Sequence, residues 1–178
     1  METSSIANNQ EQARATIKAE FEKTASSLLN TLADIRPEQI NIKPTETSWT
    51  AGQVAEHVFK SVVGIPPLFA GNTEAVQRDP AEKEQTLKDI FLDFNARYKS
   101  APNIVPSNDP HKKAEVIAAL EVVIPQIKEV IDTQDLFALC TSVEVPMLGK
   151  MTKLEWLYLV CYHTQRHVHQ LKNIMQAL

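Results

Sequence analysis

The sequence has few glycines, few cysteines and no long apolar run. Only 4 of its 178 residues are Gly and 2 are Cys. Cys140 and Cys161 form no Cys-x-x-Cys motif, so we predict buried packing roles for them rather than a disulfide framework or a Cys-rich zinc site. No apolar run approaches the roughly 18 residues of a membrane span. The polar residues 1–10 also lack a secretory pattern, and we therefore expect a cytoplasmic protein that does not bind membranes.

The charge distribution argues against nucleic acid as a partner. The net charge is −4, the isoelectric point is near 5.7, and basic residues occur no closer together than in isolated pairs such as Lys112 and Lys113. A nucleic-acid-binding surface normally needs a basic patch. At this length the chain fits one domain, residues 1–178, with a substantial core. A small molecule is the substrate class that we expect.

Hydrophobic periodicity predicts an all-α fold. Apolar residues recur with a period near 3.6 over long stretches, whereas no alternating pattern persists for the length of a strand. Two capping boxes, Thr50 with Gln53 and Thr152 with Glu155, mark helix starts, and Asp109 followed by Pro110 resembles a third start. Pro125 should kink the helix that contains it. The expected helices span residues 8–34, 51 to a break at 64, 80–98, 110–132 and 153–176.

The region between the second and fourth of these helices should cover the bundle. The charged helix at 80–98 carries one apolar stripe, which suits packing on the outside of other helices. The Pro-rich stretch 102–110 that follows it is unsuited to regular structure. We therefore expect a lid-like segment here, in addition to the helices of the bundle.

Three histidines lie on apolar helix stripes and indicate a metal site. His163 and His167 are four residues apart, so an α-helix turns them by about 400° and both can reach one ion. His57 occupies a similar stripe in an earlier helix and is the best candidate for a third ligand. A buried imidazole needs a polar partner. The alternative is that each ring is an ordinary core histidine with a hydrogen-bonding partner.

Other polar residues near these histidines have simpler interpretations. His169 is turned by about 200° from His167 and should face solvent. His111 follows Pro110 and is most simply a surface residue. Gln170 lies one turn after His167, where it can hold a ring N–H or a metal-bound water, although a polar boundary residue is equally ordinary. Glu56, Tyr162 and Arg166 neighbour the proposed ligands, but adjacent helical positions diverge by about 100°, so we expect them on the bundle exterior or in an interface.

The order of these motifs resembles the DinB-like (DinB/YfiT) superfamily over most of the chain. The resemblance rests on Ser-Trp-Thr-Ala-Gly-Gln-Val-Ala-Glu-His-Val at 48–58, Leu-Gly at 148–149, Glu-Trp-Leu at 155–157 and His-Thr-Gln-Arg-His-Val-His-Gln at 163–170. It implies a four-helix bundle with metal ligands at His57, His163 and His167, the set that spacing alone favours. Pro125 and the region 80–110 depart from the family pattern.

Three neutral histidine ligands leave the charge of an ion uncompensated and coordination positions open, as in catalytic sites. Similar proteins include thiol-dependent S-transferases, isomerases and metal-dependent hydrolases. The resemblance therefore implies a hydrolase or a transferase with a low-molecular-weight thiol cosubstrate, and often a homodimer. Imidazole suits Zn, Ni, Fe, Co or Mn, and no residue stands out as a general base. The alternative is a non-catalytic bundle that binds a metal or a small molecule.

Overall fold

The computed structural model describes the backbone of residues 2–178 and the side chains from residue 8 onwards. The chain is mainly helical, as the sequence predicts. Its α-helices are α1 Glu2–Asp34, α2 Ala51–Val62, α3 Ile65–Phe69, α4 Glu84–Leu92, α5 Lys113–Thr133 and α6 Lys153–Ala177. Two 3₁₀ turns, η1 Pro37–Gln39 and η2 Pro102–Ile104, lie between them. Two short strands, β1 Thr73–Glu74 and β2 Leu139–Cys140, pair antiparallel and were not predicted.

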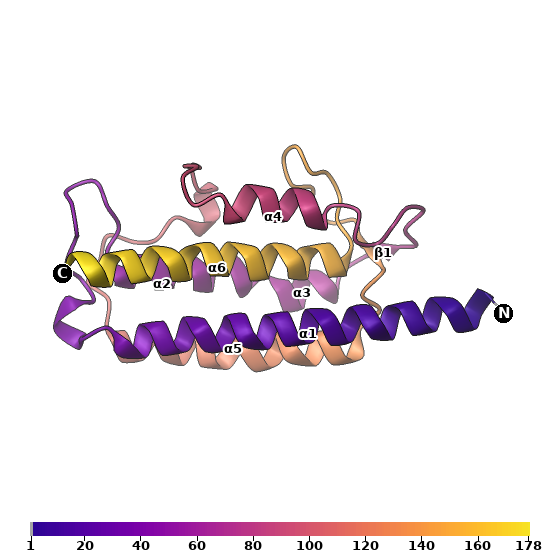
Figure 1. Ribbon diagram of the computed structural model, residues 1–178, viewed down its shortest axis with the longest axis horizontal. Helices are drawn as coiled ribbons and strands as arrows, with labels where there is room; N and C mark the ends of the chain where they lie inside the picture. The colour runs from indigo at the N-terminus through magenta and orange to yellow at the C-terminus, as the bar shows by residue number, and fades with distance from the viewer. Residues whose placement is uncertain (1) are drawn as a thin grey trace.

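The four long helices α1, α2, α5 and α6 form the bundle (Figure 1). Each contacts two of the others, since α1 packs on α5 and α6, and α2 packs on the same two helices. The colour gradient in Figure 1 shows that α1 and α6 run in one direction and that α2 and α5 run in the other. The proposed ligand helices, α2 and α6, are therefore antiparallel neighbours. A fifth helix, α4, covers α6 on its outer side.

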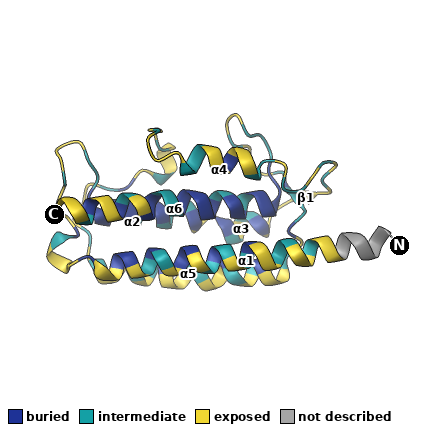
Figure 2. Ribbon diagram, in the orientation of Figure 1, coloured by how far each residue is buried: buried dark blue, intermediate teal, exposed yellow. Residues whose placement is uncertain are grey.

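α6 is the central helix of the molecule. It contacts α1, α2 and α4, and most of its residues from Lys153 to Val168 are buried, including polar ones (Figure 2). By contrast, the outer faces of α1 and α5 are exposed. A helix that is covered on several sides cannot place its polar side chains in water. The buried polar side chains of α6 must therefore find hydrogen-bond partners within the protein.

The hydrophobic core consists of two clusters that meet along α2 and α6. One cluster contains α6 residues from Leu154 to Tyr162, together with Val62 at the end of α2. The other contains Val168 and Leu171 of α6 and the first half of α2. His163 and His167 lie between these two sets of α6 residues. The proposed site therefore interrupts an otherwise apolar interior at one level of the bundle.

The predicted starts of α2 and α6 are confirmed. The Thr50 hydroxyl accepts the backbone N–H of Gln53, whose side-chain oxygen accepts the backbone N–H of Thr50, and Thr152 and Glu155 repeat this reciprocal pair. The break after α2 is also confirmed, because α3 begins at Ile65 with Pro at its first turn. The helix at Pro125 continues without interruption from Lys113 to Thr133.

Three predicted boundaries are wrong. α1 begins at Glu2 rather than near residue 8, since no Gly or Pro precedes that point to stop it. α4 spans only nine residues of the expected 80–98. The Lys83 backbone N–H donates to Glu155 at its start, and beyond its end Arg166 binds the backbone carbonyls of Asp93 and Ala96. The peptide groups that a longer helix would use are thus engaged by α6.

The third wrong boundary is the start of α5. It begins at Lys113, after an extended Lys112, instead of at Pro110. The Asn41 side chain binds both backbone groups of His111, donating to its carbonyl and accepting from its N–H, each at 2.8 Å. These two bonds engage both backbone groups of His111, which lies outside the helix. Asp109 and Pro110 therefore cannot act as the N-cap and first residue of the helix.

A buried ion pair fixes the start of α6 against the segment before α4. The Arg78 guanidinium makes two bonds to the Glu155 carboxylate, at 2.6 and 2.7 Å, and the Glu155 side chain is fully buried. Two backbone N–H groups, those of Lys83 and Thr152, also donate to this carboxylate. Because Glu155 caps the helix that carries two of the histidines, this pair sets where α6 begins.

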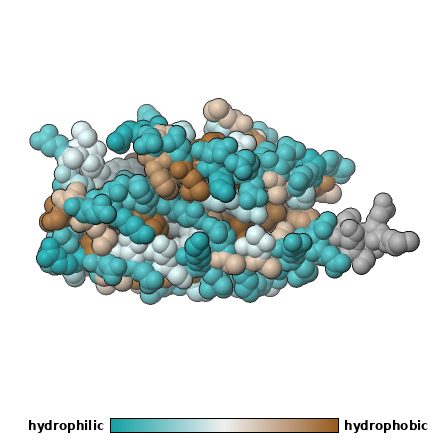
Figure 3. Space-filling view, in the orientation of Figure 1, coloured by the Kyte–Doolittle hydropathy of each residue, from teal (hydrophilic) through white to brown (hydrophobic). Residues whose placement is uncertain are grey.

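None of the described helices is both long enough and apolar enough to cross a bilayer. The face seen in Figure 3 is mainly hydrophilic, and its apolar side chains form small patches between the helices. Homodimerisation stays a prediction.

Replacing Arg78 with Leu should destabilise the fold by about 3 kcal/mol, because the buried Glu155 charge loses its bidentate partner. Urea unfolding at pH 7 measures this free energy. Arg36→Leu is the matched control, since Arg36 pairs with Glu38 on the surface and both side chains are 66% exposed. Equal losses of stability in the two variants would contradict the assigned role of the buried pair.

Candidate metal centre

The three histidines predicted as ligands come together between α2 and α6. His57 lies in the middle of α2, and its neighbours His163 and His167 lie one turn apart in α6. Their exposed fractions are 2%, 8% and 7%. The periodicity argument placed all three on buried stripes, and the packing of antiparallel α2 and α6 brings these stripes face to face.

The ring nitrogens of the three residues converge. The Nε2 atom of His163 lies 3.1 Å from the Nε2 atoms of both His57 and His167. One ligand nitrogen from each ring lies within 4.8 Å of the other two. An ion held at about 2.0–2.1 Å by imidazoles in a tetrahedral arrangement needs nitrogens about 3.3 Å apart. The observed spacing therefore fits a single transition-metal ion.

The outward nitrogens of the rings are all engaged by hydrogen-bond acceptors. His57 Nδ1 lies 2.7 Å from the Ile104 carbonyl oxygen, which can only accept. His167 Nδ1 lies 2.8 Å from the Gln170 side-chain oxygen. His163 Nδ1 makes a longer contact of 3.4 Å with the Ser61 hydroxyl, which donates its own hydrogen to the Val58 carbonyl. The contacts of His57 and His167 favour a hydrogen on Nδ1 of these two rings, whereas the roles of the His163 nitrogens depend on its tautomer.

If His163 also carries its hydrogen on Nδ1, three Nε2 lone pairs point at one another. Two bare acceptor nitrogens at 3.1 Å repel unless a hydrogen or a cation lies between them. A hydrogen on His163 Nε2 would instead join that ring to one neighbour. The three converging ring nitrogens form a donor set that fits a divalent ion.

The electrostatics of the cluster keep the rings neutral, as metal ligands must be. Burial is the main cause in each case. It lowers the pKa of His57, lowers that of His163 well below its usual range, and lowers that of His167 to about 3. The neighbouring rings His167 and His57 also lower the pKa of His163, and His57 lowers that of His167. In the metal-free protein at neutral pH, both α6 rings are therefore uncharged.

Aromatic side chains surround the imidazoles. The Trp49 ring lies 5.0 Å from that of His57, and Phe91 of α4 meets His163 edge-on at 5.5 Å between ring centroids. These partners could not be assigned from helix periodicity, because Trp49 precedes α2 and Phe91 belongs to the covering helix. Together with the backbone of Ile104, they place the cluster under α4 and the segment after it.

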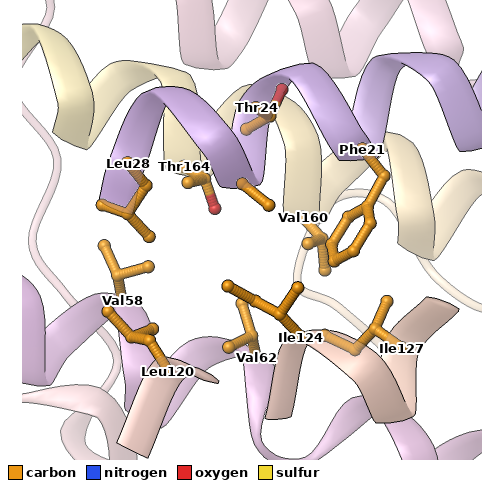
Figure 4. A pocket seen from close by; sticks show the side chains of 11 residues that line it. Phe21, Thr24, Leu28, Val58, Val62, Leu120, Ile124, Ile127, Val160 and Thr164 are labelled. Carbon is orange, nitrogen blue, oxygen red and sulfur yellow. The ribbon is translucent and has the colours of Figure 1, made fainter. Parts of the chain in front are cut away.

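The cluster does not lie in the central cavity of the bundle. That cavity, of about 20 Å³, is enclosed by α1, α2, α5 and α6 and is lined mainly by apolar side chains (Figure 4). Val58 and Thr164 line it, each one position after a proposed ligand, whereas none of the three histidines does. The histidines therefore lie at the α2–α6 contact, beside the central core rather than within it.

The segment 104–108 is bound along one face of α2. Besides the His57 contact to Ile104, Lys60 donates to the Val105 carbonyl and Glu56 accepts from the Ser107 N–H, at 2.9 and 2.7 Å. Gln53 donates to the Ser107 carbonyl at 3.1 Å. These α2 residues follow the helical spacing of three and four. The lid-like segment expected from its prolines is thus an ordered cover with many backbone bonds.

His111 does not lie where the sequence predicted, whereas Glu56 lies in an interface, one of the two locations expected for it. Instead of lying on the surface, the His111 side chain is 9% exposed, and its Nε2 lies 2.8 Å from the Glu56 carboxylate. Burial favours the neutral acid, but donors from Lys60, His111 and Ser107 outweigh it and lower the pKa of Glu56 to about 2. Glu56 therefore holds the cover in place.

The structure also shows where the other residues singled out in the sequence lie. His169 is exposed as expected and stacks on Phe94. Gln170 binds a ligand ring, as proposed for it. Tyr162 and Arg166 lie in the interface between α6 and α4, one of the two locations expected for them, because the Tyr162 hydroxyl donates to Glu84 and Arg166 binds the end of α4. The thiols Cys140 and Cys161 are free and buried, as predicted.

Comparisons with known proteins agree with this architecture. A family model described as the DinB superfamily matches residues 20–171. The uncharacterized protein YuaE of Bacillus subtilis (strain 168) is 21% identical over 159 residues, which covers 89% of this chain and 96% of that protein. A crystal structure described as TT2238, a four-helix bundle protein, shares 19% identity with a TM-score of 0.57, over 90% of this chain and 98% of that one. The structural likeness supports the fold.

Replacing Gly52 with Ala should destabilise the fold by about 1–3 kcal/mol, because the new methyl group overlaps the His111 side chain. A Cβ at this position would lie 2.6 Å from Cβ and 2.8 Å from Cγ of His111. Urea unfolding measures the loss. Gly64→Ala is the control, since nothing lies within 4 Å of its Cβ position. If Gly52→Ala cost no more than Gly64→Ala, the close packing of His111 on α2 would be wrong.

The metal-free protein should lose stability as the pH falls below about 6.5. There the unfolded state binds a proton at residue 167, whereas the folded state, in which the pKa of His167 is about 3, does not. Between pH 7 and pH 5 this difference removes about 2 kcal/mol. His167→Leu should weaken the pH dependence by that amount in urea unfolding with chelator present.

The range from pH 7 to pH 9 is the internal control for this experiment. Both states leave the ring neutral there, so the difference in stability between the variant and the parent should stay constant. Identical pH dependences of the two proteins between pH 7 and pH 5 would mean that the ring is not held neutral by the fold.

Proposed function

This chain belongs to the DinB superfamily, and we propose that it is a divalent-metal-dependent enzyme, a hydrolase or a low-molecular-weight-thiol S-transferase, whose ion is held by His57, His163 and His167. The observation that carries the proposal is the convergence of three buried ring nitrogens, with His163 Nε2 lying 3.1 Å from the Nε2 atoms of both His57 and His167. A shared cation would satisfy all three nitrogens at once.

The chemistry that a divalent ion would supply here is Lewis acidity, which lowers the pKa of a water or a thiol in an open coordination position. Three protein ligands leave such positions free. Zinc, nickel, iron, cobalt and manganese all accept imidazole ligands, so the donor set alone does not choose among them. The substrate that we propose is a small molecule.

The protein residues around the cluster hold and shield the three rings. The Ile104 carbonyl, Gln170 and Ser61 fix which nitrogen of each ring faces inwards. Trp49 and Phe91 pack against His57 and His163 and limit access of water from their sides. This arrangement supports a preorganised site, in which the ligands need no rearrangement before an ion binds.

Among the residues that the structure describes, the acid next to a ligand in sequence is not suited to act as a general base. Glu56, which precedes His57, already accepts from Lys60, His111 and Ser107, and its pKa of about 2 makes it a weak base. In this proposal the protein contributes binding and orientation, and the proton from water or thiol passes to solvent or to the substrate. A thiol needs a general base less than water does, because the pKa of a thiol is lower than that of water.

Replacing His163 with Ala should abolish binding of about one equivalent of metal per chain, since His163 is the central ligand of the three. Mass spectrometry of protein purified without an affinity tag measures the metal content. His169→Ala is the matched control, because it removes an exposed imidazole from the same helix and should leave the metal in place. Unchanged metal in His163→Ala would refute the site.

Activity assays and thermal melting test the proposal that the protein is an enzyme. Turnover of an aromatic electrophile with added thiol would identify a transferase, and metal-dependent cleavage of an activated ester would identify a hydrolase. Thermal melting with and without chelator separates a catalytic ion from a structural one, because loss of a structural ion collapses the fold. Bound metal with neither turnover would favour the non-catalytic metal- or small-molecule-binding bundle.

A further inference from the structure

All three groups that orient the proposed ligands are uncharged. They are a backbone carbonyl for His57, an amide for His167 and a hydroxyl for His163. Metal-bound histidines often donate instead to a carboxylate, which adds negative charge close to the ion. Here, neither the ligands nor the groups that hold them supply any negative charge.

Two cationic side chains lie close in sequence to the proposed ligands. Lys60 lies about one turn after His57 in α2, and Arg166 directly precedes His167 in α6. Lys60 is paired with Glu56 at 2.8 Å. The Arg166 guanidinium donates to the backbone carbonyls of Asp93 and Ala96, which are uncharged acceptors. Its positive charge is therefore not neutralised at these contacts.

These observations point to the kind of donor that the centre accepts. A divalent ion with three neutral ligands keeps its full charge, and a nearby unneutralised guanidinium adds to the positive potential. Inside a protein, where the effective dielectric constant is well below that of water, this potential strongly favours an anionic ligand over a neutral one. An acidic hydrogen-bond partner for His167 would reduce this preference for an anionic ligand over a neutral one.

We propose that Gln170 sets this charge selectivity: by giving His167 an uncharged partner, it keeps the centre cationic, so that the site takes small molecules that bind through an anionic donor atom, a carboxylate or a thiolate. This inference rests on the proposed metal centre. It goes beyond that centre by naming the class of small molecule that binds there and by assigning a role to Gln170, which is not itself a metal ligand. Gln170 is then a positioning residue that also controls selectivity.

The first experiment uses the full chain loaded with cobalt(II), whose visible spectrum reports changes in coordination. Propionate and propionamide are matched probes of similar shape that differ in charge. Propionate should change the spectrum at concentrations at least about tenfold below those that propionamide needs. A third probe, propanethiol, separates the two anionic donors, because binding as a thiolate releases a proton that a pH indicator detects.

The second experiment changes the partner of His167. Gln170→Glu keeps the length of the side chain and its acceptor oxygen but adds a negative charge. It should bind cobalt as tightly as the parent or more tightly, and it should weaken propionate binding about tenfold while leaving propionamide unchanged. Gln176→Glu adds the same charge at an exposed position near the end of α6, and it should reproduce the parent protein.

The outcomes separate this inference from the proposed function. Failure of the parent protein to bind cobalt overturns the metal centre and the inference with it. Cobalt binding with equal affinities for propionate and propionamide overturns the inference alone. The inference alone is also overturned if Gln170→Glu keeps the selectivity of the parent protein, or if Gln176→Glu loses as much selectivity as Gln170→Glu. A tenfold preference for propionate that Gln170→Glu alone removes supports it.

Discussion

The geometry of the proposed centre depends on three buried imidazoles that converge between α2 and α6. The Nε2 atom of His163 lies 3.1 Å from those of His57 and His167, whose other ring nitrogens contact acceptors. Burial disfavours a positive charge on these rings. A shared cation is a partner that this donor set fits.

The rest of the fold can be understood as the support for this arrangement. Reciprocal caps at Thr50 and Thr152 fix where α2 and α6 begin, and hence which faces their histidines occupy. The Arg78–Glu155 pair ties the start of α6 to the chain before α4. Arg166 holds the end of α4, so that Phe91 lies against His163. The contacts of Arg78 and Arg166 join segments that are distant in sequence.

The features that the sequence predicted are those set by local chemistry and helical periodicity. Both capping boxes, the convergence of the three histidines and the contact from Gln170 follow from spacings of three and four. The features that it missed depend on distant partners. Asp109 and Pro110 fail as a helix start because Asn41 binds the backbone of His111, and His111 is buried because Gly52 leaves room for it. A backbone acceptor such as the Ile104 carbonyl has no side-chain pattern by which it could be found.

The position of the site also bears on the role of an ion. Two apolar clusters meet along α2 and α6, and the central cavity that α1 and α5 help to enclose is lined by their aliphatic side chains. The histidines lie beside this core, at one level of one helix pair. Burial of aliphatic side chains on this scale stabilises a bundle without any metal, in contrast to small domains that fold only around their ion. An ion that is not needed for folding can be bound with open coordination positions, and this is the condition that the proposed catalytic role requires.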